Sequence, residues 1–197
     1  MARAVHETAR DVEVLQVDLR RPGDGAERCE ALRAALARRL GRDTAEIRLE
    51  RGPHGKPVLA APVDGLHFSS SSSGDCCLIA LTEVGPVGID VERVAPRTRL
   101  ERIAETRFAP EEAEAILSLD GEARLRAFYN CWTRKEAYLK ATGAGLTVPL
   151  DRVVVSVDDE RPAILALEGD DPADWRVASL EPRPGFVAAV VWRAATR

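Results

Sequence analysis

The chain has 197 residues, of which 45% are hydrophobic and 30% are charged, and its formal net charge is -4. This composition is typical of a globular protein with a sizeable core, and the absence of a basic excess argues against a nucleic-acid partner. No apolar run is long enough for a membrane span or a signal peptide, so we expect a cytoplasmic protein without a membrane partner.

Hydrophobic periodicity predicts two series of elements, and in each of them helix precedes a meander of short strands. The first series comprises a strand at 12–19, a helix at 26–40, and strands at 47–50, 66–71, 76–82 and 87–94. The second comprises helices at 100–108, from Pro110 and at 122–142, then strands at 153–157, 163–167, 175–180 and 186–192. We therefore expect an α+β fold of two similar halves, residues 1–95 and 96–197, with a ligand cleft between them.

The segment Gly88-Ile89-Asp90-Val91-Glu92 places two carboxylates two residues apart in a predicted strand. Residues at this spacing share one face of a strand, so Asp90 and Glu92 point to one place while Ile89 and Val91 pack the other way. Two like charges held close together favour a bound cation, and hard oxygen ligands suit magnesium. A solvated face at a sheet edge is the alternative reading of this pattern.

The predicted helix at 122–142 carries Trp132, Glu136 and Lys140 on one stripe, because residues four apart lie on the same helix face. An acid and a base beside an indole suggest a half-buried site, although a surface ion pair would have the same spacing. Glu136 is a candidate third metal ligand or a base for an attacking hydroxyl, and Lys140 is a candidate phosphate ligand.

Two polar segments of the first half are candidates for phosphate binding. Residues 51–57 form a glycine-rich turn with Arg51 and Lys56, and residues 69–73 are five consecutive serines. Side chains and exposed backbone N–H groups of such turns can hold phosphate oxygens. Taken alone, each segment also reads as an ordinary polar loop.

In this order, the motifs GKP at 55–57, HF-x-x-S-x-SG at 67–74, GIDVE at 88–92 and W-x-x-KEAYLK at 132–140 resemble the 4'-phosphopantetheinyl transferases of the surfactin-synthetase (Sfp) type. The resemblance implies a pseudo-dimer of two α+β halves with the active site at their interface. It implies magnesium at Asp90, Glu92 and Glu136. It also implies contacts with coenzyme A at the following positions: Arg51, Lys56, Ser71, Ser72, Asp90 and Lys140.

The activity implied is magnesium-dependent transfer of phosphopantetheine from coenzyme A to a serine of an apo acyl or peptidyl carrier protein, with release of 3',5'-ADP. Such carriers serve fatty acid, polyketide or nonribosomal peptide synthesis. Glu136 and Lys140 would be the catalytic residues, and the carrier would dock on the 96–197 half, near the arginines between Arg93 and Arg107. We expect a monomer, because the fold is already an internal pseudo-dimer.

The chain departs from the family pattern at two places. Serine replaces the family's asparagine at position 69 and its phosphate-binding histidine at position 72, and the segment between 19 and 26 is short. These departures favour the main alternative, a weakened paralogue that binds coenzyme A or a carrier protein without transfer. A different magnesium-dependent nucleotide enzyme is a further alternative.

Overall fold

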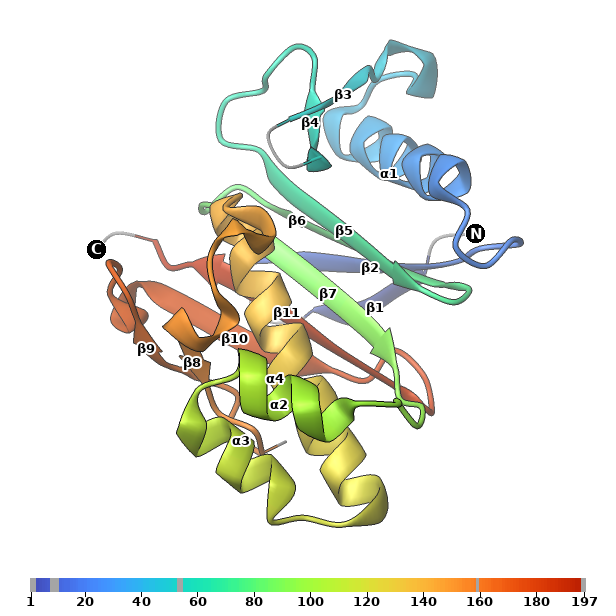
Figure 1. Cartoon of the computed structure of the whole chain (residues 1–197). Helices are drawn as coiled ribbons and strands as arrows, with labels where there is room; N and C mark the ends of the chain where they lie inside the picture. The colour runs from blue at the N-terminus through green and yellow to red at the C-terminus, as the bar shows by residue number, and fades with distance from the viewer. Residues whose placement is uncertain (1–2, 8–10, 53–54, 159, 196–197) are drawn as a thin grey trace.

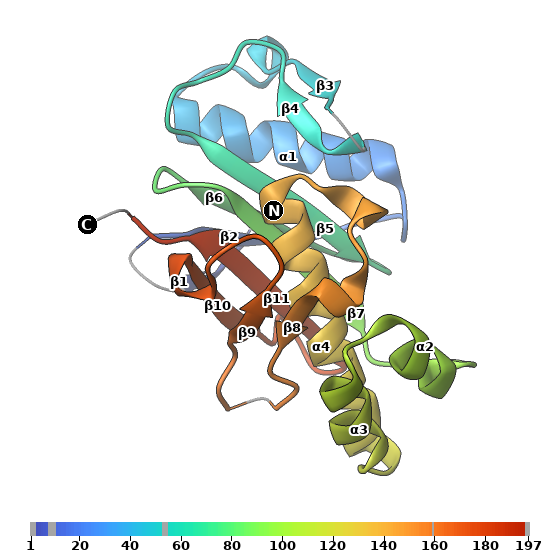
Figure 2. The same ribbon diagram turned by 60° about the vertical axis from the view of Figure 1, so that its left-hand side comes forward.

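The computed structural model describes residues 3–7, 11–52, 55–158 and 160–195. Within these ranges the chain forms two main antiparallel sheets, and each sheet is covered by one long helix (Figures 1 and 2). The expected α+β class is confirmed. No helix in the described ranges combines the length and the apolar character needed to cross a bilayer.

The first sheet has the order β1-β2-β6-β5. Its strands are β1 (Arg3–Glu7), β2 (Glu13–Asp18), β5 (His67–Ser73) and β6 (Cys76–Thr82). Helix α1 (Gly25–Leu40) covers one face, and its buried residues Leu32 and Leu36 join the cluster that contains Ile79 of β6. The Asp24 side chain caps its first turn by accepting from two backbone N–H groups, and Gly41 ends it at a φ of 63°.

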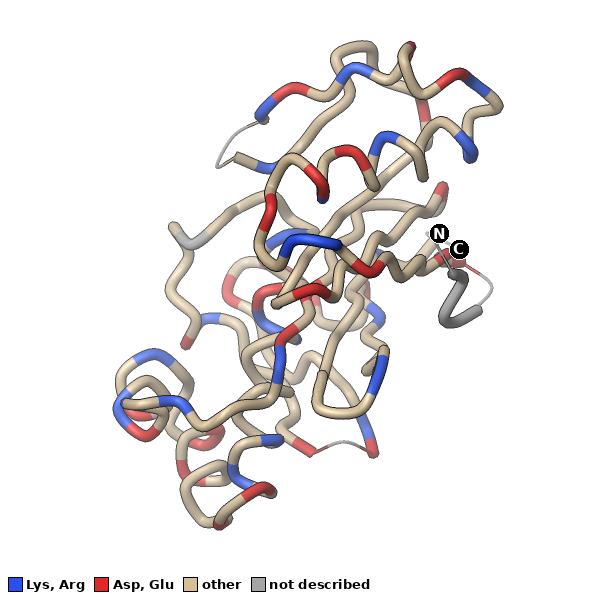
Figure 3. The backbone as a smooth tube through the Cα atoms, turned by 90° about the vertical axis from the view of Figure 1, so that its right-hand side faces the viewer, with Lys and Arg blue, Asp and Glu red and all other residues tan. Residues whose placement is uncertain are grey.

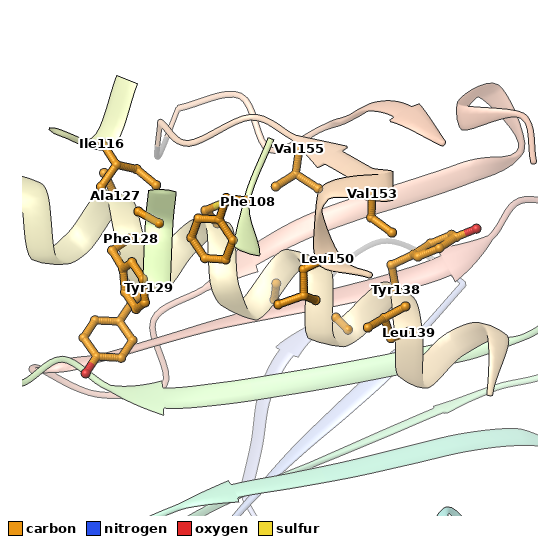
Figure 4. Packing of buried hydrophobic residues seen from close by; sticks show 14 of the residues in the cluster. Phe108, Ile116, Ala127, Phe128, Tyr129, Tyr138, Leu139, Leu150, Val153 and Val155 are labelled. Carbon is orange, nitrogen blue, oxygen red and sulfur yellow. The ribbon is translucent and has the colours of Figure 1, made fainter. Parts of the chain in front are cut away.

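The second sheet has the order β10-β11-β7. Its strands are β7 (Val87–Arg93), β10 (Trp175–Leu180) and β11 (Phe186–Arg193). Helix α4 (Gly121–Thr142) lies across one face, and α2 (Leu100–Arg107) and α3 (Pro110–Leu117) pack beside it. Figure 4 shows the apolar side chains of this layer, in which the rings of Phe108 and Phe128 lie 5.4 Å apart.

A third apolar layer joins the two sheets face to face. It contains Val14 and Leu78 from the first sheet, and Ile89 and Val190 from the second. Each sheet is therefore buried on both faces at its centre, which accounts for the continuous burial of β6.

Two small hairpins complete the fold. They are β3 (Leu49–Arg51) with β4 (Pro57–Leu59), and β8 (Val153–Val155) with β9 (Ile164–Leu167). The sequence pattern indicated a strand from 47, but a 3-10 turn at Thr44–Glu46 delays it, and β1 and β4 were not expected.

Strand β7 falls before the expected division of the chain near residue 95, yet it pairs with β11 from after that division. The second sheet therefore takes strands from both halves of the sequence, and the division at residue 95 stays a prediction. Strands β5 and β7 run side by side, although they belong to different sheets (Figure 1).

Candidate functional site

A cavity of about 560 Å³ lies where α1, β5 and α4 meet the loop before β4. Its polar and charged side chains are contributed by residues that lie far apart in the sequence. They are Arg28, Lys56, Ser69, Ser70, Glu136, Lys140 and Thr147. Three of these side chains are cationic and one is acidic, so the cavity favours an anionic ligand.

Gly88 allows β7 to approach α4 closely enough to form this site. A Cβ atom at Gly88 would lie 1.9 Å from the backbone oxygen of Ala137 and 2.4 Å from the backbone nitrogen of Ala141. Strand and helix therefore touch backbone to backbone. The predicted face split of β7 is confirmed, because Ile89 and Val91 belong to the apolar layer between the sheets while Asp90 forms an ion pair with α4.

Asp90, Lys140 and Ser71 form a hydrogen-bonded cluster. The Lys140 ammonium lies 2.6 Å from Asp90 Oδ1 and donates to Ser71 Oγ over 2.9 Å. Ser71 Oγ in turn donates to the same Asp90 oxygen over 2.8 Å. Asp90 is only 5% exposed whereas the Lys140 side chain is 29% exposed, so the pair is partly shielded from water.

The serine run divides by face, as the period of a strand requires. Ser69, Ser71 and Ser73 point to β7, where they bond to the Ile89 backbone N–H, to Asp90 and to Glu92. Ser70 and Ser72 stand opposite Ile79 and Cys77, two residues that pack under α1. Alternate serines of the run therefore contact β7 on one face and lie on the α1 side on the other, a division that the repeated serines of the sequence did not indicate.

Glu92 and Glu136 are half-buried carboxylates with disturbed ionisation. Burial raises the pKa of Glu136, and the negative charges of Asp90 and Glu92 add to the effect. Burial and the charge of Asp90 likewise raise the pKa of Glu92, against a hydrogen bond from Ser73. The three predicted metal ligands are therefore close enough to repel one another.

The same residues offer the chemistry of a divalent-cation site, although the site is not preformed. In the described ranges no three histidine, cysteine or acidic side chains are grouped closely enough to hold a metal ion. Asp90 Oδ2 is nevertheless buried without a hydrogen-bond partner. An unpaired buried carboxylate oxygen beside two mutually repelling acids suits a hard cation. The assignment of magnesium to Asp90, Glu92 and Glu136 stays a prediction.

Lys56 links the glycine-rich turn to the end of α4. Its ammonium donates to the backbone oxygen of Lys140 over 2.5 Å and lies 3.4 Å from that of Val87. Burial, together with the charge of Lys140, lowers the pKa of Lys56 to about 8. The pKa of the neighbouring His67 is lowered as well, by burial and by the charge of Lys56.

The other predicted phosphate ligands take less central positions. Arg51 is exposed at the end of β3 and does not line the cavity, and Pro53 and His54 of the same turn lie outside the described residues. Ser72 faces α1, with its Oγ 3.5 Å from Arg28 Nη1. Sequence reasoning did not select Arg28, because a lone arginine on an amphipathic helix looks like a surface residue.

Lys135, a second lysine of the KEAYLK motif, lies in the core and not at the cavity. It pairs with Glu112 of α3 over 2.6 Å, with side-chain exposures of 0% and 2%. It also donates to the backbone oxygens of Leu150 and Val153. These contacts join α4 to α3 and β8. Only the structure shows that Lys135 lies in the core while Lys140 lies at the cavity.

The arginines proposed for carrier docking are exposed, and one of them covers the tryptophan of the stripe. The Arg97 guanidinium lies over the Trp132 ring, 4.9 Å from its centre. Figure 3 shows that cationic and acidic residues are interspersed along the chain, so charge alone does not single out a docking face.

Comparison with known proteins adds a family context. A family model described as the 4'-phosphopantetheinyl transferase superfamily matches residues 86–191. The chain is 37% identical over 153 residues to the slr0495 protein of Synechocystis sp., covering 76% of this chain and 61% of that protein. It is 35% identical over 161 residues to the 4'-phosphopantetheinyl transferase HetI of Nostoc sp., covering 81% of this chain and 66% of HetI.

A third relative is the 4'-phosphopantetheinyl transferase Sfp of Bacillus subtilis. The chain is 31% identical to it over 159 residues, covering 81% of this chain and 69% of Sfp. The matched part of the chain thus spans between 61% and 69% of the length of these three relatives.

Proposed function

The chain belongs to the 4'-phosphopantetheinyl transferase superfamily, and we propose that it transfers the phosphopantetheine arm of coenzyme A to a serine of an apo carrier protein. The observation that carries this proposal is the contact between the two motif segments. Strand β7 and helix α4 bring Asp90 within 2.6 Å of Lys140, beside a cavity that three cations line. A polyanion such as coenzyme A is the class of ligand that this cavity favours.

The reaction is a direct phosphoryl transfer. The serine oxygen of the carrier forms a bond to the β-phosphorus of coenzyme A, and the bond from this phosphorus to the bridging oxygen breaks, so that 3',5'-ADP leaves. Positioning and charge neutralisation supply most of the catalysis in such transfers. Magnesium, held by Asp90, Glu92 and Glu136, would neutralise charge on the pyrophosphate.

Glu136 is the proposed acceptor of the serine proton. It lines the cavity, and within the described ranges no hydrogen bond or ion pair occupies its carboxylate. In the metal-free protein its pKa is raised by burial and by the charges of Asp90 and Glu92, which makes it a stronger base than an ordinary glutamate.

Lys140 is the proposed ligand of the leaving phosphate. Lys56 is proposed to hold Lys140 in position. Without substrate the Lys140 ammonium forms an ion pair with Asp90. A bound cation would replace Lys140 as the partner of Asp90, and a bound phosphate would replace Asp90 as the partner of Lys140. The hydrogen bond from Lys56 to the Lys140 backbone fixes the last turn of α4. Arg51, Lys56, Ser71, Ser72 and Asp90 remain proposed coenzyme A contacts, and cytoplasmic location and the monomeric state remain expectations.

The decisive experiment incubates the protein with coenzyme A, magnesium and a panel of apo carrier proteins, followed by mass spectrometry of each carrier. A carrier heavier by one phosphopantetheine group supports transfer. Glu136→Gln should abolish most of the product, while Glu122→Gln, an exposed acid in the first turn of the same helix, should not. Coenzyme A binding without product from any carrier would instead favour a binding protein.

A further inference from the structure

Arg28 is the fourth residue of α1 and faces the cavity from the side opposite α4. Its half-buried side chain lines the cavity beside Leu32. Its Nη1 atom lies 3.5 Å from Ser72 Oγ, at the outer limit of a hydrogen bond. Ser72 pairs with Cys77 in the register of β5 and β6, so the guanidinium lies over this part of the sheet.

Arg28 has no acidic partner in the described ranges, whereas three other arginines on or near α1 do. Arg38 and Arg39 pair with Glu13 and Glu83, and Arg20 pairs with Glu27. A half-buried guanidinium held only by a weak contact to a hydroxyl retains most of its donors for another group. The position suits an anion that enters the cavity.

The charges around the cavity indicate which anion this is. Arg28, Lys56 and Lys140 line it from three separate elements, against the single carboxylate of Glu136. Lys140 and Lys56 lie close together at the end of α4, joined through the Lys140 backbone. Arg28 reaches the cavity from a different helix, so it can bind a second part of a ligand that carries several phosphates.

We propose that Arg28 binds a phosphate of coenzyme A, so that α1 and α4 grip the ligand from opposite sides. This inference rests on the proposed function and adds a binding residue to it. The guanidinium offers a planar fork that matches two phosphate oxygens, which a lysine at the same position would not reproduce. Ser72 orients the fork through its weak contact and yields when phosphate binds.

The test is calorimetric titration of the whole protein with coenzyme A and with 3'-dephospho-coenzyme A. Arg28→Met keeps the aliphatic stem beside Leu32 and removes the charge. We expect it to weaken coenzyme A binding by about 10- to 100-fold, the effect of one charge-assisted hydrogen bond. Arg28→Lys should fall between this variant and the native protein. The matched control is Arg33→Met, an exposed α1 arginine that does not line this cavity.

The dephosphorylated ligand identifies which phosphate is bound. If Arg28 holds the 3'-phosphate, Arg28→Met and the native protein will bind 3'-dephospho-coenzyme A equally. If it holds the pyrophosphate, the difference between them will persist. Both outcomes support the inference, provided that thermal unfolding shows each variant to be folded.

Two outcomes would overturn the inference while leaving the proposed function intact. One is unchanged coenzyme A affinity in Arg28→Met when the native protein binds coenzyme A and modifies a carrier. The other is an equal loss in Arg33→Met, which would indicate a diffuse electrostatic effect. A native protein that neither binds coenzyme A nor modifies any carrier would overturn the proposed function and this inference together.

Discussion

Gly88 of β7 and Ala137 of α4 are packed so closely that a Cβ atom on the glycine would lie 1.9 Å from the alanine backbone oxygen. A backbone oxygen cannot rotate aside as a side chain can. The contact therefore fixes how far the strand carrying Asp90 stands from the helix carrying Glu136 and Lys140. The glycine of the GIDVE motif is a condition for the site, although it carries no chemistry itself.

Gly88→Ala should destabilise the protein by about 3 kcal/mol or more, at or above the usual range for overpacking. In a chain of this size that corresponds to a fall in the unfolding midpoint of roughly 6–12 °C. Gly85→Ala is the control, because its Cβ would approach Arg193 at an acceptable 3.4 Å. Thermal unfolding of the two variants checks the prediction, and equal midpoints would contradict it.

Lys135→Met should destabilise the fold without removing a cavity residue. Breaking a buried pair by deleting one partner costs about 3–5 kcal/mol, because the remaining charge of Glu112 is left in the core. The double variant Lys135→Met with Glu112→Gln should recover part of this loss. Denaturant unfolding measures both. A Lys135→Met variant as stable as the native protein would show that the pair contributes little.

Glu136→Gln should stabilise the metal-free protein at neutral and alkaline pH while it reduces transfer. The pKa of Glu136 is raised in the folded state, so the ionised form opposes folding, and stability falls as the pH rises through that pKa. The glutamine variant should lack this fall and gain about 2–4 °C for each 1 kcal/mol relieved. No gain is expected below the pKa of the unfolded glutamate, where the native side chain is already neutral.

The same variant should lose activity on the order of 10²–10³-fold, as expected for one preorganised catalytic group. Thermal unfolding in the presence of a chelator measures the expected gain in stability, and carrier modification assays measure the expected loss of activity. Lower stability of Glu136→Gln across the whole pH range would show that the carboxylate is held by a favourable contact.

Coenzyme A binding should weaken as the pH rises above about 8, where the free protein loses the charge on Lys56. Binding of a polyanion favours protonated Lys56, so the affinity should fall by up to about tenfold per pH unit above that value. Lys56→Met should remove this step, and Lys56→Arg should shift it out of range because arginine stays charged. Titrations between about pH 7 and about pH 9 measure it. An identical slope in Lys56→Met would assign the step to another group.

Ser71→Ala should cost about 1–3 kcal/mol, because it removes a buried hydrogen-bond partner of Asp90 and Lys140. Ser72→Ala should stay within about 0.5 kcal/mol, since its hydroxyl is half-exposed and makes only a weak contact. Denaturant unfolding of the two neighbours tests the division of the serine run by face. Equal losses would contradict it.

Much of the site followed from strand and helix periods. The spacing of Asp90 and Glu92 placed both on one face of β7, because this pattern depends on local geometry. Of the predicted helix stripe, Glu136 and Lys140 line the cavity, whereas Trp132 packs against Phe128 and does not. The α+β class followed from the alternation of apolar runs in the same way.

Other features depend on contacts between distant segments, which no local pattern reveals. Lys135 and Lys140 share one motif, yet one meets Glu112 in the core and the other meets Asp90. Arg28 approaches Ser72 only because α1 packs over β5. The replacement of the family histidine by serine at position 72 therefore could not reveal that the cationic side chain of Arg28 lies close to this position. The pairing of β7 with β11 likewise joins segments far apart in the chain.

The serine contacts between β5 and β7 have a mechanical consequence. The neighbouring strands of the two sheets are joined by hydroxyls, to Asp90, Glu92 and the Ile89 backbone, and belong to different ladders. This seam is softer than a continuous sheet, because side chains reorient more easily than paired backbones. A ligand in the adjoining cavity would touch α1 and β5 on one side and α4 on the other. Part of the free energy of ligand binding would then stabilise the contact between the two sheets.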